Sequence, residues 1–369
     1  MSNPLQQLTH LGQSAWYDFI TRDLVRSGEL ARLIKEDALR GMTSNPTIFE
    51  KAVAASSDYD ADIQSLAKAG KSVEEIVEAF MIDDVRAAAD VFRPVYDASG
   101  HGDGTVSIEV SPTLAFDTQG TIDAARRIWK TIDRPNVMVK IPGTEAGLPA
   151  IKQCLADGIN INITLLFSVD RYKQVIEAFK AGLEQRVAAG LPVNTLHSVA
   201  SFFVSRVDLQ TDAELAKAGD KGAPLLHKLG IANARVAYQV FGNSLLTPRW
   251  QALAEKGAKA QRPLWASTGT KDPKLPDIMY IEALIAPDTV NTIPPDTYNA
   301  YRDHGKPEVR ITPGSELEAA AQLSAYEKLG LSPLADRTAF LEADGVKKFS
   351  ESWNALLDRV KQKASALAA

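Results

Sequence analysis

Lys140 is the residue of this sequence best suited to act as a nucleophile. It lies in the segment NVMVKIPG (residues 136–143), which has the pattern of a short buried strand stopped by a Pro-Gly pair. Side chains alternate along a strand, so Lys140 shares a face with the apolar Met138. Burial disfavours an unpaired ammonium and favours the neutral amine, which attacks carbonyl carbon. The ordinary alternative is a lysine that reaches solvent or pairs with a carboxylate.

Further polar residues lie at or just after the ends of other apolar segments. Each of them has a plain structural interpretation: a surface acid, a turn residue, an ion-pair partner of Lys140, a helix cap or a solvated cation. One such residue at a strand end could be a coincidence, but a series of them at successive strand ends is much less probable by chance. We therefore interpret the set as a site. Its polar members are Asp18, Asn45, Glu109, Asn162, Thr164, Ser201, Arg206 and Lys271, and the apolar Phe203 shares a strand face with Ser201.

Eight short apolar or β-branched segments are the strands that must position these residues. Most are separated by segments with apolar residues at three- and four-residue spacing, such as 72–96, 121–131, 147–157 and 169–189. This alternation predicts an α/β fold, a (β/α)8 TIM barrel whose site lies at the C-terminal ends of the strands. No Gly-x-Gly-x-x-Gly follows a strand, which disfavours a dinucleotide-binding sheet. The strands are expected at 14–19, 39–43, 105–110, 136–141, 159–165, 196–202, 264–267 and 289–293, of which 14–19 fits the start of a helix equally well.

Two regions exceed a minimal barrel. Residues 208–230 are rich in Ala, Lys and Asp, which predicts an inserted helical segment, and a helical tail is expected from Pro295 onward, ending in residues 336–369. We expect one barrel domain over residues 1–369, with 296–369 as a C-terminal extension packed on it. The tail could also mediate assembly, and the sequence leaves open whether the chain is a monomer or a homodimer.

Composition limits the classes of partner and compartment. A 369-residue chain with 45% hydrophobic and 24% charged residues is typical of a globular protein, and a net charge of -5 gives no argument for nucleic acid or a membrane surface. The single cysteine, Cys154, excludes an intramolecular disulfide and should pack on the helix after Lys140. The five histidines show no metal-binding spacing. We expect no metal, no membrane span and a cytoplasmic location.

Five motifs, in order along residues 14–295, resemble those of the transaldolase family. GMTSNPTIF (41–49) resembles the N-terminal signature, and SVASFFVSR (198–206) resembles the sixth strand. VSIEV (106–110), VMVKIP (137–142) and NINITLLFS (160–168) resemble the central strands. The resemblance implies transfer of a dihydroxyacetone unit between sugar phosphates in the non-oxidative pentose phosphate pathway. The implied reaction interconverts sedoheptulose 7-phosphate plus glyceraldehyde 3-phosphate with erythrose 4-phosphate plus fructose 6-phosphate, without cofactor or metal.

The resemblance also implies a role for each polar residue at the strand ends. Lys140 would form a Schiff base, and Asp18 would be the acid/base for carbon–carbon cleavage. Glu109 and Thr164 would position a water that relays protons. The long tail and the 208–230 segment resemble the long bacterial subgroup of the family. The substrate-binding residues would be Asn45, Asn162, Ser201, Phe203, Arg206 and Lys271, with Arg206 on phosphate and Lys271 where many members carry a second phosphate-binding arginine.

Three other functions remain to be distinguished from transfer. A related fructose 6-phosphate aldolase would use the same lysine and release free dihydroxyacetone; such aldolases carry a tyrosine where Phe203 stands, so Phe203 favours transfer. A metal-dependent sugar-phosphate isomerase or epimerase would need His and acidic ligands, and only Asp18, Glu109 and His197 come close. A phosphosugar-binding barrel without turnover would not need the chemically competent residues that stand at every matched position.

Overall fold

The computed structural model describes residues 3–368, and its centre is a closed barrel of eight parallel strands in chain order. The predicted (β/α)8 barrel is therefore confirmed, including the strand that fitted a helix start equally well. Strand ends differ from the predicted ones by a few residues; the fifth strand, for example, begins at Ile161. The strands are β1 (Gln13–Tyr17), β2 (Gly41–Thr43), β3 (Thr105–Glu109), β4 (Val137–Pro142), β5 (Ile161–Leu166), β6 (Ser198–Phe203), β7 (Arg262–Ala266) and β8 (Thr289–Ile293).

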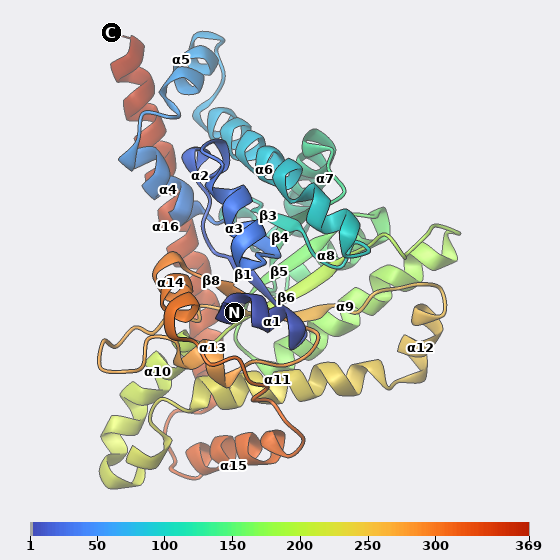
Figure 1. Ribbon diagram of the computed structural model, residues 1–369, viewed down its shortest axis with the longest axis vertical. Helices are drawn as coiled ribbons and strands as arrows, with labels where there is room; N and C mark the ends of the chain where they lie inside the picture. Colours follow the sequence, from blue (N-terminus) through green and yellow to red (C-terminus); the bar gives the residue numbers. More distant parts are fainter. Residues whose placement is uncertain (1–2, 369) are drawn as a thin grey trace.

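Helices surround the barrel because each connection between parallel strands must cross one of its faces (Figure 1). The longest of these connections, α6, begins with a capping box between Ser72 and Glu75 and buries apolar side chains at helical spacing against the strands. The helices before β7 are α1 (Pro4–His10), α2 (Arg22–Arg26), α3 (Glu29–Asp37), α4 (Pro46–Ala55), α5 (Asp60–Lys68), α6 (Val73–Ala98), α7 (Thr118–Ile132), α8 (Gly147–Asp157), α9 (Val169–Ala188), α10 (Ser205–Leu215), α11 (Leu229–Leu245) and α12 (Pro248–Ala254). After it come α13 (Met279–Ala283), α14 (Pro295–His304), α15 (Ser315–Glu327) and α16 (Leu334–Ala368).

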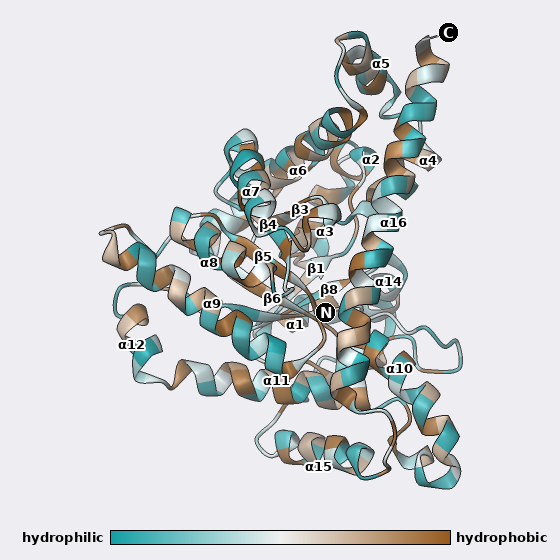
Figure 2. Cartoon of the chain, turned by 180° about the vertical axis from the view of Figure 1, so that it is seen from behind, coloured by the Kyte–Doolittle hydropathy of each residue, from teal (hydrophilic) through white to brown (hydrophobic). Residues whose placement is uncertain are grey.

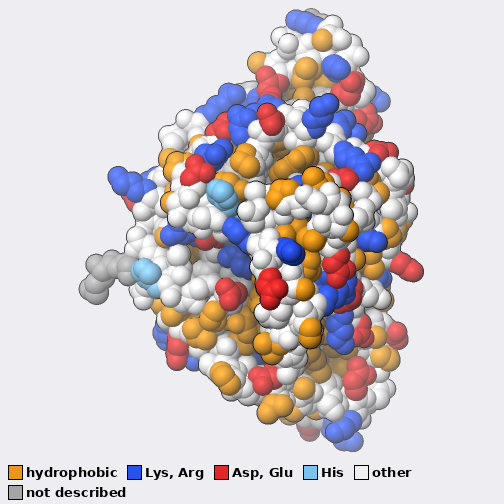
Figure 3. Space-filling view, turned by 90° about the vertical axis from the view of Figure 1, so that its right-hand side faces the viewer, with side chains coloured by type: hydrophobic (Ala, Val, Ile, Leu, Met, Phe, Trp, Pro, Cys, Tyr) orange, Lys and Arg blue, Asp and Glu red, His pale blue; other side chains and the backbone are white. Residues whose placement is uncertain are grey.

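Polar and apolar residues are distributed as this layered architecture requires. Nearly every strand residue is buried, as in sheets covered on both faces, and the helices carry alternating hydrophilic and hydrophobic bands (Figure 2). On the face drawn in Figure 3, Lys and Arg side chains are interspersed with Asp and Glu. None of the helices in the described part of the chain has the length and apolar composition needed to cross a membrane.

The two predicted helical additions are both present. Residues 208–230 continue α10 and then form two short 3-10 helices, η2 (Ala216–Lys221) and η3 (Ala223–Leu225), before α11 begins. Gly219 interrupts η2 with a φ of 54° and a ψ of -132°, a backbone conformation that favours glycine. The tail after β8 forms α14, α15 and α16; residue 369, at the end of the predicted tail, lies outside the described residues.

Helix α16 is the longest helix of the described residues and crosses the barrel end toward α5 (Figure 1). It packs on α4, α5, α6, α10 and β5. Its Trp353, Leu356 and Val360 side chains are buried in the main core. Polar contacts add to this packing: Thr47 Oγ1 donates to Ser352 Oγ at 2.8 Å, and Lys363 Nζ pairs with an Asp60 carboxylate oxygen at 2.6 Å. The helix is thus fixed along much of its length.

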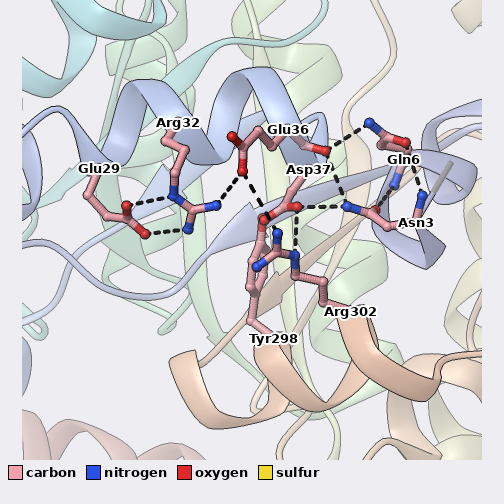
Figure 4. Close-up of polar contacts among 8 residues, drawn as sticks. All are labelled: Asn3, Gln6, Glu29, Arg32, Glu36, Asp37, Tyr298 and Arg302. Carbon is pink, nitrogen blue, oxygen red and sulfur yellow. Dashed lines mark hydrogen bonds and ion pairs between the residues drawn. The ribbon is translucent and has the colours of Figure 1, made fainter.

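A buried carboxylate joins α1, α3 and α14 at the edge of the barrel (Figure 4). Asp37 is fully buried and accepts hydrogen bonds from the Asn3 amide at 2.7 Å and from the Tyr298 hydroxyl at 3.3 Å. The Arg302 Nε atom lies 2.9 Å from the same carboxylate. Because α14 directly follows β8, these contacts hold the β8–α14 junction, which borders the cavity described next.

Candidate active site

A cavity of about 530 Å³ opens at the C-terminal ends of the strands. Eight of the residues predicted from sequence to form a site line it, although they come from segments spread over most of the chain. Glu109 and Asn162 do not form part of its wall, and they lie on the strands that flank Lys140. The predicted residues in the wall are Asp18, Asn45, Lys140, Thr164, Ser201, Phe203, Arg206 and Lys271.

Lys140 is buried near the end of β4, with only 5% of its surface exposed. In the sheet register it lies between Glu109 on β3 and Asn162 on β5. Its Nζ atom lies 3.5 Å from Glu109 Oε2 and donates a hydrogen bond to the Ser44 carbonyl at 3.3 Å. The amine faces the cavity from a desolvated position, as a lysine that attacks a carbonyl carbon requires.

Glu109 is a buried carboxyl whose proton affinity is strongly perturbed. Burial raises the pKa of Glu109 to about 7, the positive charge of Lys140 opposes that rise, and the negative charge of Asp18 adds to it. Apart from the Lys140 contact, neither Glu109 oxygen has a hydrogen-bond partner among the described residues, and neither does Thr164 Oγ1. A carboxyl that titrates near neutrality beside free polar atoms is suited to proton transfer.

Asp18 directly follows β1, and its carboxyl thereby reaches the cavity. Its Oδ1 accepts a hydrogen bond from the Thr43 hydroxyl at 2.6 Å, and the Thr292 hydroxyl lies 2.6 Å from that of Thr43. Burial raises the pKa of Asp18, and the positive charges of Lys140, Lys271 and Arg206 limit the rise. The Thr43 hydroxyl fixes the carboxyl orientation at the floor of the cavity.

Of three predicted substrate-binding residues, two line the cavity and the third supports its wall. Asn45 lines the cavity and caps α4, where its Oδ1 accepts a hydrogen bond from the Ile48 backbone at 3.1 Å, so its amide nitrogen is left for other contacts. Asn162 lies behind the wall, because its amide donates to Ser107 Oγ at 3.0 Å and its oxygen accepts from Ser201 Oγ at 2.7 Å. Ser201 itself lines the cavity, so Asn162 orients a hydroxyl there.

Two cations meet at the outer part of the cavity. Burial lowers the pKa of the Arg206 guanidinium, and the same effect, followed by the positive charge of Arg206, lowers the pKa of the Lys271 ammonium at the rim. Arg206 stacks on Phe203, with its guanidinium carbon 5.6 Å from the ring centre, and no hydrogen bond joins it to another described residue. Two neighbouring cations, one of them a guanidinium that forms no ion pair with a described carboxylate although the charges of Asp344 and Asp18 act on it, are suited to a phosphate group.

The structure also adds residues that the strand-end pattern did not single out. Thr292 orients Thr43, and a signal for it existed in the polar Thr289–Ile293 strand. Phe349 comes from α16, lines the cavity and places its ring centre 5.9 Å from Lys140 Nζ. Nothing in the sequence indicates where α16 packs, so Phe349 could not be found from it.

Cys154 and His197 lie apart from this cavity. Cys154 is buried on α8, as expected, and burial raises the pKa of its thiol to about 12. His197 precedes β6, at the opposite end of that strand from Phe203. No group of three or more His, Cys, Asp or Glu side chains between residues 3 and 368 is placed to hold a metal ion.

Comparison with known proteins gives a single family. The model of the transaldolase/fructose-6-phosphate aldolase family matches residues 15–360. A transaldolase of Thermobifida fusca (strain YX) is 50% identical over 367 residues, covering 99% of this chain and 100% of the relative. A transaldolase of Parafrankia sp. (strain EAN1pec) is 49% identical over 370 residues, covering 100% of both, and transaldolase 2 of Nostoc sp. (strain PCC 7120) is 46% identical over 380 residues, covering 99% and 98%. The chain therefore belongs to the transaldolase/fructose-6-phosphate aldolase family.

Proposed function

We propose that this protein is a transaldolase, which moves a three-carbon dihydroxyacetone unit from a ketose phosphate to an aldose phosphate through a Schiff base on Lys140. The observation that carries the proposal is the buried Lys140 amine beside the Glu109 carboxyl, in a cavity that also contains Asp18 and ends in two cations. Sedoheptulose 7-phosphate and fructose 6-phosphate are the donors, and glyceraldehyde 3-phosphate and erythrose 4-phosphate are the acceptors. The names of the relatives agree with this activity.

Schiff-base formation needs a nucleophile and a proton relay. The Lys140 amine adds to the donor C2 carbonyl, and loss of water from the carbinolamine gives an iminium ion. Glu109 and Thr164 hold the water that carries protons to and from this centre, since their polar atoms are otherwise unpartnered. The raised pKa of Glu109, about 7, lets it both accept and return a proton near neutral pH.

Carbon–carbon cleavage needs a base on the hydroxyl of the donor's C4. Asp18, held by Thr43, removes that proton, and electrons of the C3–C4 bond pass to the iminium nitrogen to form an enamine. Asn45 and Ser201 bind the hydroxyl groups of the dihydroxyacetone part, and Asn162 orients Ser201. Arg206 and Lys271 bind the phosphate at the far end of the cavity.

The family also contains fructose-6-phosphate aldolases, so release of free dihydroxyacetone is the second candidate function. Release requires a proton on the enamine carbon. Phe203 stands in the cavity wall with no proton to give. The enamine is therefore kept until an acceptor aldehyde reacts with it, which favours transfer over release.

The test is glyceraldehyde 3-phosphate formation from fructose 6-phosphate, with and without erythrose 4-phosphate and with EDTA throughout. A transaldolase forms product catalytically only when the acceptor is present, because without it the reaction stops after one equivalent per enzyme, and the Lys140→Met variant gives none. Product without acceptor, together with free dihydroxyacetone, would identify an aldolase instead. Full transfer activity in Lys140→Met would refute the Schiff-base mechanism.

The chain would act as one barrel domain over residues 1–369, with the extension over residues 296–369 forming part of it; residues 1–2 and 369 lie outside the described structure. Packing of α16 on α4, α5 and α6 supports this organisation. A chain with one buried cysteine and sugar-phosphate substrates fits a reducing cytoplasmic compartment.

A further inference from the structure

The ring of Phe349 lies against the lysine that would carry the covalent intermediate. Phe349 is 6% exposed, lines the same cavity as Lys140 and has its ring centre 5.9 Å from Lys140 Nζ. It is delivered by α16, which follows all eight strands in the chain. The steps proposed above use no group on this side of the amine.

Phe349 and Phe203 line the cavity and belong to one apolar cluster, most of whose other members pack behind them. The cluster includes Phe203 from β6, Leu165 and Phe167 at the end of β5, and Val346 one turn before Phe349. The Phe167 and Phe203 rings pack with their centres 5.1 Å apart. Apolar side chains give water no hydrogen-bond partner, so this side of the cavity disfavours water near Lys140.

The position of the Phe349 ring is set by a close approach of α16 to β5. A Cβ atom on Gly345, four residues before Phe349, would lie 3.0 Å from Leu165 Cδ2, so glycine allows the helix to approach this strand closely. Residues four apart share one helix face, so the face that meets β5 at Gly345 also presents Phe349 to the cavity. The hydrogen bond between Thr47 and Ser352 holds the helix on the other side of Phe349.

We propose that Phe349 is a specificity-determining residue, whose ring keeps water away from the Lys140 adduct and so retains the three-carbon unit for an acceptor aldehyde. This inference rests on the proposed transaldolase function. The proposal implies that Lys140 has a polar environment on one side and an apolar one on the other. Glu109 and Thr164 supply polar partners for the one water that the reaction needs, and Phe349 excludes further water.

The step that the ring opposes is hydrolysis of the enamine left after cleavage. It consumes one water, whose oxygen bonds to C2 while the C2–N bond breaks. One proton of that water goes to C3 and the other to the Lys140 nitrogen, giving dihydroxyacetone and the free amine. Water admitted beside Lys140 would promote both proton transfer to C3 and attack at C2. Phe203 has no proton to donate to C3, and the Phe349 ring keeps water away from C2 and C3.

The experiment compares the full-length chain with Phe349→Ala, Phe349→Leu and the control Phe340→Ala. Phe340 is on the same helix and is 50% exposed, so its truncation should leave both reactions unchanged. Each protein is given fructose 6-phosphate and erythrose 4-phosphate, and free dihydroxyacetone is measured against transferred product. Borohydride with fructose 6-phosphate alone traps the Schiff base and reports on Lys140 separately.

We expect Phe349→Ala to raise the ratio of release to transfer about tenfold, because removing the ring leaves space for water beside the enamine on Lys140. Phe349→Leu should give a smaller rise. A ratio within about twofold of the unchanged chain in folded Phe349→Ala would overturn the proposal. If Phe349→Ala does not fold, Phe349→Leu decides by the same criterion, and loss of adduct formation in Phe349→Leu would assign the ring to Schiff-base formation instead. Absence of both adduct and transfer in the unchanged chain would refute the proposed function and not this inference alone.

Discussion

The pKa of Glu109 predicts how the stability of the fold depends on pH, and Glu109→Gln tests it. Burial raises that pKa from 4.5 to about 7 in the folded chain. The folded state therefore holds a proton that the unfolded state has lost between these values. The stability that this contributes is fully present below pH 4.5 and is lost as pH rises through about 7. Glutamine has no proton to lose, so the variant lacks this dependence.

The size of the effect follows from the two pKa values. At 1.36 kcal/mol per pH unit, the full change is about 3 kcal/mol, and most of it falls between about pH 5 and about pH 8. We expect the free energy of unfolding of the unchanged chain, minus that of Glu109→Gln, to fall by most of this amount over that range. Loss of the contact with Lys140 also changes the free energy of unfolding of Glu109→Gln by an amount that is the same at every pH. The prediction concerns only how the difference between the two proteins changes with pH.

Urea unfolding followed by circular dichroism at several pH values measures this difference. Glu351→Gln is the matched control, since its carboxyl is on the exposed face of α16 and its removal should leave the difference flat. If the free energy of unfolding of the unchanged chain minus that of Glu109→Gln stays constant or grows with pH, burial does not raise the pKa of Glu109 and the prediction is refuted. The same pKa should appear as a limb near pH 7 in kcat/KM and disappear in Glu109→Gln.

Substitutions at four further positions test single parts of the structure. Asp18→Asn should still give a borohydride-trapped adduct while glyceraldehyde 3-phosphate formation falls by about 100-fold or more; unchanged turnover would exclude Asp18 from cleavage. Phe203→Tyr should raise release of dihydroxyacetone relative to transfer, measured as a product ratio. Arg206→Ala should raise KM for phosphorylated donors about tenfold or more, with Arg206→Lys recovering part of it; equal KM values would contradict phosphate binding. Asp37→Asn should lower the free energy of unfolding by about 1–3 kcal/mol in urea titration without changing the product ratio.

The barrel was predictable because its evidence is local. Each apolar segment such as Val137–Pro142 is short, is bounded by turn residues and is separated from the next by a helical pattern. Parallel strands then place their C-terminal ends together, so residues as distant in sequence as Asp18 and Arg206 were expected in one cavity. The same rule placed Asn162 beside Lys140, but it did not give the hydrogen bonds of its amide with Ser107 and Ser201. Hydrogen-bond partners depend on rotamers and neighbours that a strand pattern does not contain.

Contributions from helices that follow the barrel were not predictable. The apolar stripe of α16 indicates that one face is buried, but it does not state which surface covers it. Phe349 reaches Lys140 only because α16 turns this face to β5 and α4. The perturbed pKa of Glu109 likewise depends on how completely its neighbours bury the carboxyl, which the strand pattern does not specify.

The order of elements along the chain has a consequence for synthesis on the ribosome. All eight strands are translated before α16, so a nascent chain can complete its barrel and present Lys140 while the Phe349 ring has not yet emerged. Such a nascent barrel would expose the apolar cluster at its open end, a surface that invites chaperones or aggregation until α16 covers it. Once α16 has been translated and has packed, the apolar cluster would be covered. At the same point the Phe349 ring would reach Lys140 and add its proposed contribution to the preference for transfer.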